Sequence, residues 1–258
     1  MKLYRAYAKV NIFLKITGTR DNYHEIISRF VLVDSLYDEL SFFPKNEDEF
    51  KIIGDFSCKL EQNTIYKAYK ALLDFTSSKS LENLMQKYAV KVDKKIPAFA
   101  GLGGGSSDAA TYLKMCNTTL DLGLSQKELA NIGLKVGADV PFFIYGYTSA
   151  NVSGIGEVVQ EFKEDPLEFE VYTPDVEIST PRVYISYREN FFNPITADKA
   201  DKLKNKNSLD VLNSLSADEA NDLFKPAFLE YSELKNHYKH GYYFSGSGSS
   251  FFKVKEVN

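Results

Sequence analysis

The sequence predicts an α+β protein in which runs of strand character alternate with runs of helix character. Residues 3–16 alternate between apolar and polar side chains, which is the period of a half-buried strand. Residues 63–76 instead place apolar side chains three and four positions apart, as an amphipathic helix does. A glycine-rich segment, residues 101–105, lies between a strand-like run and a helix-like run. Together these observations predict the α+β class.

The N-terminal region is predicted to form strands. After the alternating run at 3–16, residues 17–22 are rich in Thr, Gly, Asp and Asn and predict a turn. Two apolar runs, 26–34 and 38–43, predict a further pair of strands. The polar residues 44–48 are the expected exposed connection that follows them.

The next region is predicted to contain two helices and one strand. Asn63 or Thr64 is the expected N-cap of a helix that ends near Thr76. The alternating residues 88–93 predict a strand that leads into the glycine-rich segment, and residues 107–120 predict a helix that follows it.

Capping and turn signals organise the middle of the chain. Ser125 and Glu128 have the spacing of a capping box and predict a helix start. Residues 142–162 resemble a hairpin, because two strand-like runs flank a Ser-Gly-Ile-Gly sequence. Short strands are expected at 168–172 and 176–179.

The last sixty residues or so carry weaker signals. Residues 198–206 are dense in Lys, Asp and Asn and are expected to be a solvated stretch. Helices are predicted near 208–215 and 217–236, followed by strands at 242–244 and 251–254.

The bulk composition excludes several classes of protein. The net charge of −4 argues against a nucleic-acid scaffold, since binding to a phosphate backbone requires a basic face. Cys58 and Cys116 lack the spacing of a zinc site or a disulfide framework. No apolar run approaches the ~20 residues of a membrane span, and the first residues lack a signal-peptide core. We therefore expect a cytoplasmic protein without a nucleic-acid or membrane partner.

The glycine-rich segment has the features of a phosphate-binding loop. Glycines permit positive φ and close approach of the backbone, while the first turn of a helix offers unpaired N–H groups to an anion. The alternative is a mobile Gly/Ser surface turn. Such a turn would not need the strand pattern before the loop or the helical spacing of Ala109, Ala110 and Leu113 after it.

Three common nucleotide-binding loops do not match. A Walker loop requires a Lys after its last glycine, but Ser106 and Ser107 follow Gly105. A dinucleotide fingerprint would need Ser106 in place of its third glycine, and no strand at the chain start feeds it. The His-Arg-Asp and Asp-Phe-Gly triplets of protein kinases are missing from the sequence.

Three motifs together resemble the GHMP small-molecule kinases. The first is the loop Gly101–Ser107, with the sequence G-L-G-G-G-S-S. The second is the chain start Ala8–Gly18 followed by Tyr23-His24-Glu25, and the third is Gly137–Phe143. Within that superfamily, the combination is similar to the kinases that act on 4-diphosphocytidyl-2-C-methyl-D-erythritol. The resemblance is weakest between about residues 190 and 240.

The resemblance implies a fold of two domains with a cleft between them. Residues 1–154 would form an ATP-binding and catalytic domain similar to domain 2 of ribosomal protein S5. Residues 155–258 would form a ferredoxin-like domain on the substrate side.

The resemblance also implies the reaction. ATP, with Mg²⁺, would phosphorylate the 2-hydroxyl of 4-diphosphocytidyl-2-C-methyl-D-erythritol in the methylerythritol phosphate pathway to isoprenoid precursors. Asp108 stands where the family often has an amide, and it would repel phosphate unless magnesium lay between, so the metal ligands are left unassigned. The implied ATP-binding residues are Asn63, Lys94, Pro97, Ala98, Phe99, Ala100, Gly101, Leu102, Gly103, Gly104, Gly105, Ser106 and Ser107.

Lys9 and Asp139 are the implied catalytic residues. Phosphoryl transfer needs positioning and charge stabilisation more than covalent help from the protein. Asp139 lies in an apolar stretch, where a carboxylate needs a partner, and the resemblance supplies Lys9. Asp139 would accept the hydroxyl proton while Lys9 neutralises developing charge. From the residues alone, Asp139 could equally be a helix C-terminal cap or an ion-pair residue, and Lys9 a surface lysine.

Tyr23 and His24 form a candidate site for a nucleobase. An aromatic ring can stack on a base while an imidazole reads the edge of that base. The resemblance assigns this role to the cytosine of the substrate and adds Tyr184 as a second ring, Asn11 near the methylerythritol and Thr180 in the same pocket. The alternative is an exposed turn histidine beside a packed tyrosine.

Two other functions are kept as alternatives. A sister kinase for mevalonate, homoserine or a sugar would keep the loop but would have no use for Tyr23 and His24 as base readers. A non-catalytic nucleotide-binding module would have no need of Lys9 or Asp139. The presence of all four residues favours the cytidine-containing substrate.

Overall fold

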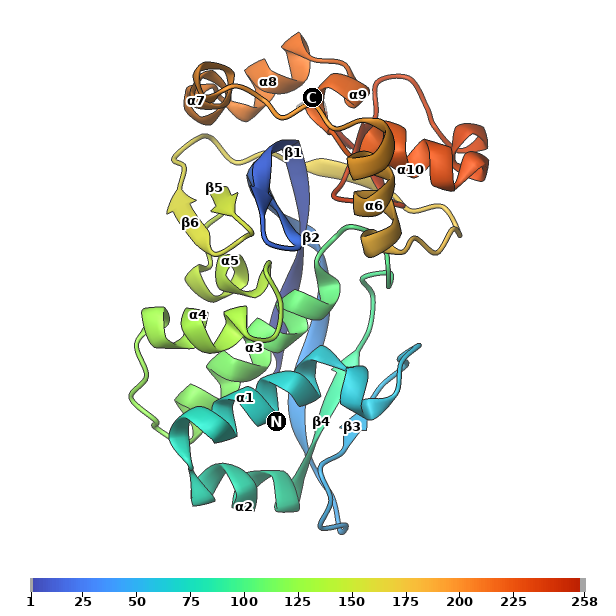
Figure 1. The fold of residues 1–258 in the computed structure, drawn as a ribbon. Coiled ribbons are helices and arrows are strands. Elements are labelled where there is room, and N and C mark those ends of the chain that lie inside the picture. Colours follow the sequence, from blue (N-terminus) through green and yellow to red (C-terminus); the bar gives the residue numbers. More distant parts are fainter. Residues whose placement is uncertain (1, 256–258) are drawn as a thin grey trace. The chain divides into compact units, whose positions relative to one another are not determined.

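The computed structural model describes residues 2–255, which gather into two compact units (Figure 1). Unit 1 comprises Met1–Ala8, Leu36–Ile96 and Gly103–Gly146. Unit 2 comprises Lys9–Ser35, Pro97–Leu102 and Tyr147–Asn258. The chain therefore passes between the units several times, and the domain boundary expected between residues 154 and 155 stays a prediction.

Two long strands open the chain, β1 (Tyr4–Arg20) and β2 (Tyr23–Pro44). The turn predicted over 17–22 is wrong in its extent, because only Asp21 and Asn22 leave the strands. Asp21 has φ of 53°, a left-handed backbone that Asp tolerates better than most residues. The expected break between 26–34 and 38–43 is also wrong. The polar residues there are exposed on a continuous strand and do not end it.

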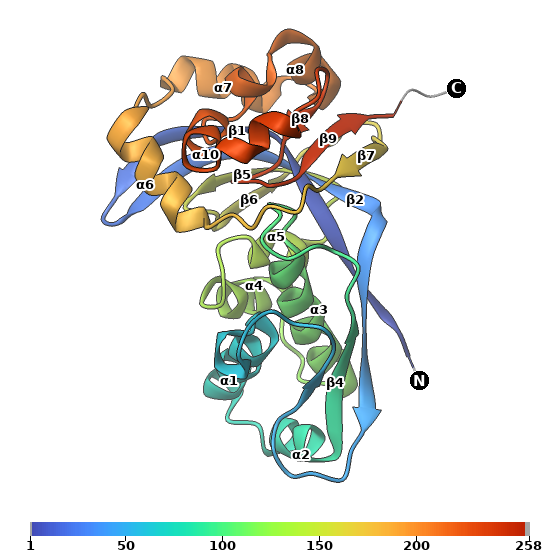
Figure 2. The same cartoon turned by 90° about the vertical axis from the view of Figure 1, so that its right-hand side faces the viewer.

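In unit 1, the second half of β2 pairs with β4 (Tyr88–Asp93), as predicted for a strand at that position (Figure 2). The pairing is antiparallel, from Glu39 opposite Asp93 to Pro44 opposite Tyr88. The short β3 (Ile52–Ile53) lies parallel to β4 on its other edge. The connection after β2 is exposed, as expected for residues 44–48.

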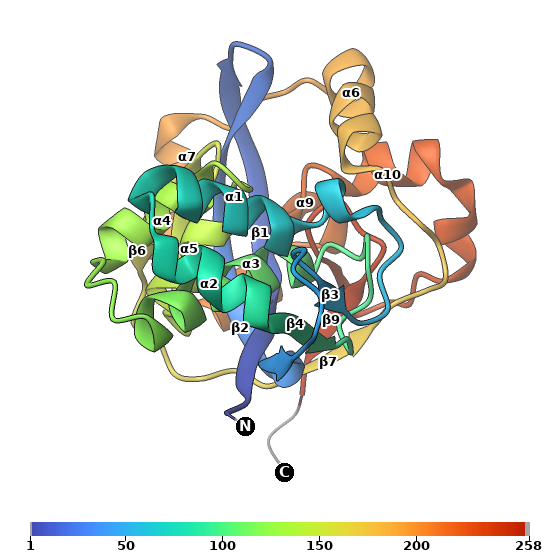
Figure 3. The same ribbon diagram turned by 90° about the horizontal axis from the view of Figure 1, so that it is seen from below.

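Helices pack against one another beside these strands (Figure 3). The mutually contacting helices are α1 (Thr64–Thr76), α3 (Gly104–Thr119), α4 (Gln126–Leu134) and α5 (Val140–Tyr145), while α2 (Lys79–Lys87) leads into β4 and a 3₁₀ turn (Leu60–Gln62) precedes α1. The Asn63 side chain caps α1 by accepting a hydrogen bond of 2.9 Å from the backbone N–H of Ile65. The capping box of Ser125 and Glu128 is confirmed at the start of α4.

The hairpin predicted over 142–162 is wrong in its first part, because these residues include most of α5. A run of apolar residues that is buried on every side gives no period to separate helix from strand. Pro141 lies in the first turn of this helix, where its missing N–H is not needed. The hairpin consists of β5 (Ser149–Gly154) and β6 (Val158–Glu161).

In unit 2, the first half of β2 pairs with β5. A separate antiparallel sheet has the order β7 (Phe169–Tyr172), β9 (Phe251–Val254) and β8 (Tyr243–Phe244). The helices of this unit are α6 (Thr180–Asn190), α7 (Ala197–Asn205), α8 (Ser208–Ser214), α9 (Ala217–Ala220) and α10 (Phe224–Glu230), followed by a 3₁₀ turn (Ser232–Asn236).

Three predictions for this unit are corrected. Residues 176–179 form no strand and instead turn into α6, with the N–H of Val176 bonded to the carbonyl of Pro174 at 2.8 Å. The solvated stretch 198–206 is exposed, but it is the helix α7 with only Ala200 buried. The helix predicted over 217–236 is three short pieces, because the Asn221 side chain turns the chain after α9.

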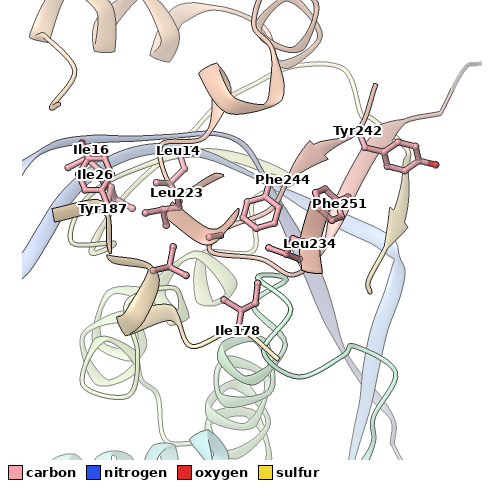
Figure 4. Close-up of a cluster of buried hydrophobic side chains, with 12 residues drawn as sticks. Leu14, Ile16, Ile26, Ile178, Tyr187, Leu223, Leu234, Tyr242, Phe244 and Phe251 are labelled. Carbon is pink, nitrogen blue, oxygen red and sulfur yellow. The ribbon is translucent and has the colours of Figure 1, made fainter. Parts of the chain in front are cut away.

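The core of unit 2 brings β1, α6, α10 and the small sheet together (Figure 4). Phe244 lies near its centre, with ring centroids 5.6 Å from Phe224, 6.0 Å from Phe228 and 5.3 Å from Phe251. These edge-on and tilted contacts fix the backbone that immediately precedes the Ser245–Ser250 segment.

Candidate active site

The predicted site residues are divided between the two units. Unit 1 holds Asn63, Lys94, Gly103, Gly104, Gly105, Ser106, Ser107 and Asp139. Unit 2 holds Lys9, Asn11, Tyr23, His24, Pro97, Ala98, Phe99, Ala100, Gly101, Leu102, Thr180 and Tyr184. Each set is described within its own unit.

The first half of the glycine-rich segment, residues 97–102, packs against a second glycine-containing loop, residues 245–250. Gly101 has φ of 72°, and a Cβ there would lie 2.1 Å from the carbonyl oxygen of Ser245. The hydroxyl of Ser245 donates to the carbonyl of Gly101 at 3.0 Å, and the N–H of Ser250 donates to the carbonyl of Ala100 at 3.1 Å. The backbones of Gly101 and Ser245 therefore lie so close together that only a glycine fits at position 101.

The second half of the segment begins α3, three residues earlier than predicted. Gly103 is the N-cap, with φ of 71°. A Cβ at Gly104 would lie 2.8 Å from a methyl carbon of Ile96, and the Thr64 hydroxyl donates to the carbonyl of Gly105 at 2.6 Å. The loop thus delivers the N-terminus of a long helix, where unpaired N–H groups and the helix dipole favour an anion.

Lys94 is held by two buried carboxylates in unit 1. Its ammonium lies 2.8 Å from Asp108 and also contacts Asp38. Asp38 accepts hydrogen bonds from the backbone N–H groups of Lys95 at 2.5 Å and Ile96 at 2.8 Å, so it also fixes the chain that enters the loop. Burial lowers the pKa of Lys94, but the two carboxylates outweigh burial and raise it above 10.5.

Asp108 faces this lysine. Its side chain is 1 % exposed, and its second carboxylate oxygen has no hydrogen-bond partner among residues 2–255. Burial raises the pKa of Asp108 to about 7, against the opposing effect of Lys94. The expected repulsion between Asp108 and phosphate is therefore moderated by an ion pair within the protein.

Lys9 is a buried lysine of unit 2, and the surface-lysine alternative is wrong. The side chain is 3 % exposed, and its ammonium donates to the Asn11 amide oxygen at 2.6 Å and to the carbonyl of Gly101 at 3.0 Å. It also lies 4.6 Å from the ring centroid of Phe30. The Asn11 amide donates in turn to the Ser28 hydroxyl at 2.9 Å. Lys9 and Asn11 therefore form one network that reaches the glycine-rich segment.

Asp139 occupies the N-cap position of α5, yet its side chain makes no capping hydrogen bond. The C-cap of the preceding helix α4 is Lys135. The alternative in which Asp139 is a helix C-terminal cap is therefore wrong. The carboxylate is partly buried at the start of a helix whose residues 140–144 are all buried.

His24 lies between the aromatic rings of α6 in unit 2. Its ring centroid is 5.1 Å from Tyr184, with an interplanar angle of 31°, and 5.8 Å from Tyr187 in an edge-on contact. His24 is 9 % exposed, and its Nε2 has no hydrogen-bond partner in the described part of the chain. Burial, helped by Arg188, lowers the pKa of His24, so the imidazole is neutral at neutral pH.

The rings around His24 differ in accessibility. Tyr23 is 63 % exposed, whereas Tyr184 is partly buried. At the start of the same helix α6, the Thr180 hydroxyl lies 2.7 Å from that of Ser247 in the second glycine-containing loop. Thr180 is thus tied to the loop that contacts Gly101.

Comparisons with known proteins decide the family. The sequence profile described as GHMP kinases N terminal domain matches residues 63–147. A 4-diphosphocytidyl-2-C-methyl-D-erythritol kinase of Sulfurimonas denitrificans is 72% identical over 99% of this chain and 98% of its own length. The enzyme of the same name from a Sulfurovum species is 43% identical over 97% of this chain and 98% of its own length. The chain belongs to the 4-diphosphocytidyl-2-C-methyl-D-erythritol kinase family.

Solved structures that resemble this chain include a member of the same family. A crystal structure of 4-(cytidine 5'-diphospho)-2C-methyl-D-erythritol kinase superposes with a TM-score of 0.74 and 30% identity, covering 99% of this chain and 90% of that one. The mevalonate kinase of Methanococcus jannaschii, at 15% identity and a TM-score of 0.60 over 99% and 90% of the two chains, shares the fold. The predicted α+β GHMP kinase fold and the prediction of an ATP-dependent small-molecule kinase are confirmed.

Some structural partners of the site in this family member were not predicted. Ser28, Asp38 and Asn221 are buried polar residues whose roles come from distant contacts. Asn221 donates to the carbonyls of Phe244 and Gly246 at 2.9 Å each. The Ser-Gly-Ser-Gly sequence at 245–248 was a usable signal, whereas a single Asp or Asn in a polar surround offers none.

Two features are missing from residues 2–255. No helix there is both long and apolar enough to cross a membrane. No group of three or more His, Cys, Asp or Glu side chains there could hold a metal ion.

Proposed function

We propose that this chain transfers the γ-phosphoryl group of ATP to the 2-hydroxyl of 4-diphosphocytidyl-2-C-methyl-D-erythritol, giving the 2-phosphate and ADP, in the methylerythritol phosphate pathway. The names of the full-length relatives support the reaction. The observation that carries the substrate assignment concerns His24, which lies beside the ring of Tyr184. Its Nε2 is buried and has no hydrogen-bond partner among residues 2–255.

The base-reading role of His24 follows from the cost of burying a polar atom. A buried nitrogen without a hydrogen bond destabilises a protein by about 1–3 kcal/mol. Binding of a cytosine would supply a partner, since a neutral imidazole offers either a donor or an acceptor to the edge of a base. The exposed ring of Tyr23 is available to stack on the same base. Mevalonate and homoserine contain no group that would stack in this way.

The ATP-binding role is proposed for the loop residues 97–107. The N-terminus of α3 supplies the N–H groups, and the missing Cβ at Gly104 lets this turn of backbone pack against Ile96. We propose that Lys94 mainly holds the loop in place and contributes little to neutralising the phosphates of ATP. Its ammonium contacts Asp38 and Asp108, so the three side chains together carry little net positive charge. Asn63 caps the adjacent α1 and would contact ATP only through its remaining polar atoms.

We propose catalytic roles for Lys9 and Asp139 from the contacts that each side chain makes within its own unit. The ammonium of Lys9 donates to the Asn11 amide oxygen and to the carbonyl of Gly101, and we propose that, from this fixed position, it stabilises charge developing on the transferred group. Asp139 is not used as a cap, and we propose that it accepts the proton of the 2-hydroxyl. Asn11 and Thr180 would orient the alcohol of the substrate.

Mg²⁺ is proposed to enter with ATP. The described residues contain no cluster of three candidate ligands, but magnesium often binds through one or two protein groups, several waters and the phosphates themselves. The residues present are compatible with that mode. Magnesium would supply charge neutralisation on the phosphates. Consumption of ATP with and without EDTA tests this requirement.

The proposed substrate is tested by measuring ATP consumption with a panel of alcohols. We expect turnover with 4-diphosphocytidyl-2-C-methyl-D-erythritol and at least about 100-fold lower kcat/KM with mevalonate, homoserine or methylerythritol 4-phosphate, because these lack the base. His24→Ala should narrow the preference for the cytidine substrate over its uridine analogue, while His237→Ala, which removes a histidine bonded to Tyr172, should leave it unchanged. Equal kcat/KM for the substrates without a base would favour a sister kinase.

A further inference from the structure

Unit 2 contains a cavity of about 750 Å³ whose walls include no residue assigned above to ATP or substrate. This volume lies within the range of about 300–1,000 Å³ that is usual for small-molecule sites. The walls come from β1, the end of α6, α7 and the region from α8 to α10 (Figure 1). The kinase reaction proposed above makes no use of this cavity.

Part of the cavity lining is apolar. It includes Tyr187, Phe191, Ile195, Leu203 and Leu215. Tyr187 is 2 % exposed, and its hydroxyl is engaged by the backbone N–H of Asn193 at 3.2 Å. Ile195 donates its N–H to the carbonyl of Ile16 at 2.8 Å, which fixes the segment between α6 and α7 to β1. These apolar residues could cover a ring or a short hydrocarbon chain.

The charged part of the lining consists of five lysines and three acidic residues. The acidic residues have partners within the protein. Asp222 pairs with Lys15 and accepts from the N–H of Ile16 at 2.7 Å. Asp218 lies 2.9 Å from the ammonium of Lys225. Glu219 accepts from the N–H of Ser216 at 2.9 Å.

Three lysines of the cavity have no carboxylate partner among residues 2–255. Lys206 donates to the Ser214 hydroxyl at 2.8 Å. Lys199 and Lys202 have neither an ion pair nor a hydrogen bond with any described residue, and they lie three positions apart on α7. That spacing puts them on one side of the helix. A protein with a net charge of −4 therefore concentrates positive charge at this cavity.

The C-terminal end of α7, which follows Lys202, is fixed by a buried arginine. Arg29 is 0 % exposed and donates to the carbonyls of Lys204 at 2.7 Å and Lys206 at 3.3 Å. Its guanidinium lies 3.3 Å from the ring centroid of Phe162 and 3.6 Å from a carboxylate oxygen of Glu164. The cavity wall is therefore part of the folded core and is not a loosely attached helix.

We propose that this cavity binds a small amphiphilic anion, with its ring or chain against the apolar residues of the lining and its anionic group at Lys199 and Lys202. The apolar residues favour desolvation of a hydrocarbon, and the two ammonium groups favour a carboxylate, sulfonate or phosphate over a neutral head group. The proposal does not depend on the kinase reaction.

The test uses two fluorescent probes with the same aromatic body. One is 8-anilinonaphthalene-1-sulfonate, which carries an anionic group, and the other is neutral N-phenyl-1-naphthylamine. The full chain should bind the sulfonate at one saturable site, and Lys199→Gln with Lys202→Gln should weaken that binding roughly 3- to 30-fold, the range for loss of two exposed charge contacts. Binding of the neutral probe should change less than about twofold.

The matched control is Lys67→Gln with Lys70→Gln, a pair of exposed lysines at the same spacing on α1. This pair should leave both probes unaffected. Saturating ADP and cytidine diphosphate should not displace the sulfonate, which separates the cavity from the kinase site. Equal weakening by the two lysine pairs, no weakening by either, or displacement by the nucleotides would overturn the proposal.

Discussion

The ammonium of Lys94 lies 2.8 Å from a carboxylate oxygen of Asp108, which is in the first turns of the helix that follows the glycine-rich segment. An aspartate near a phosphate-binding helix start would ordinarily oppose an anion. Here the ammonium of Lys94, which also contacts a second buried carboxylate, Asp38, offsets part of that negative charge within the protein. The first turns of this helix can thus carry an aspartate.

Asp108→Asn should change how stability depends on pH. The folded-state pKa of Asp108, about 7, lies above its ordinary value of 3.8, so the folded protein retains a proton that the unfolded chain releases between those values. The free energy of unfolding of the wild type should fall as the pH rises from about 4 to about 7, by on the order of a few kcal/mol from this group. The asparagine variant has no titrating group at this position, so its free energy of unfolding should lack this dependence on pH. Urea unfolding at several pH values measures the difference.

The pKa of Lys94 is raised above 10.5, so this lysine does not titrate in that window. The unfolding free energy of Asp108→Asn minus that of the wild type should therefore increase as the pH rises, and it should level off above about pH 8. Parallel curves for the two proteins from pH 4 to pH 8 would contradict the buried, proton-retaining state of Asp108.

Gly101→Ala should destabilise the protein and impair ATP binding. A Cβ at this position would meet a backbone carbonyl at 2.1 Å, which no side-chain movement can relieve. Gly123→Ala is a matched control, because Gly123 also has a positive φ, 66°, but a Cβ there meets nothing within 4 Å. The control should lose only the ~1 kcal/mol of a left-handed alanine. Similar losses in both variants, by thermal unfolding and calorimetry with ATP, would rule out the close contact.

Asp139→Asn should reduce kcat by about 10²–10⁴ while ATP affinity changes little, because a general base acts on the acceptor hydroxyl. Asp121→Asn, at an exposed turn with φ of 49° that asparagine also tolerates, is the control and should keep full activity. Steady-state kinetics and nucleotide binding are the measurements. Retention of more than roughly a third of kcat by Asp139→Asn would remove this residue from the catalytic role.

Tyr23→Ala should raise KM for the cytidine substrate roughly 5- to 150-fold, since a base–aromatic stack contributes about 1–3 kcal/mol. The KM for ATP should hardly change. Phe43→Ala removes another exposed aromatic ring from the same strand, 42 % exposed against 63 % for Tyr23, and should leave both KM values unchanged. A KM for the cytidine substrate that is equal in Tyr23→Ala and wild type would show that this ring does not stack on the base.

Arg29→Met should destabilise the protein by about 3–5 kcal/mol, because removal of one partner leaves a buried charge uncompensated on Glu164. Burial lowers the pKa of Arg29 to about 10 against the effect of Glu164, so the arginine is charged at neutral pH. Arg182→Met breaks an exposed pair with Glu230 and should cost less than about 1 kcal/mol. Urea unfolding measures both losses of stability. Comparable decreases in the free energy of unfolding for the two variants would contradict a stabilising role for the buried pair of Arg29 and Glu164.

The sequence predicted well wherever the signal was local. Asn63 as a cap, the capping box at Ser125 and the strand at 88–93 depend on neighbours within a few residues, and all three are confirmed. The predicted hairpin over 142–162 failed at α5, because continuous burial removes the period that separates the two structures. The helix α7 was missed because its charged residues leave almost no buried stripe.

For the site, the motifs located the loop, but they could not supply its partners. The contacts of Lys94 with Asp38 and of Gly101 with Ser245 join residues that are 56 and 144 positions apart in sequence. Such pairs follow from tertiary packing, which a single sequence without an alignment does not display. The burial of Lys9 was equally invisible, since a lysine in a strand pattern is ordinarily on the surface.

The contact between Gly101 and the segment 245–250 also bears on biosynthesis. A nascent chain emerges from its N-terminus, so the residues at 97–102 leave the ribosome long before the partner loop exists. Until that loop has been translated, the carbonyls of Ala100 and Gly101 lack the donors from Ser250 and Ser245. The backbone contacts of residues 100 and 101 are thus completed only after residues 245–250 have been translated, and a chain that stops before them cannot form these contacts.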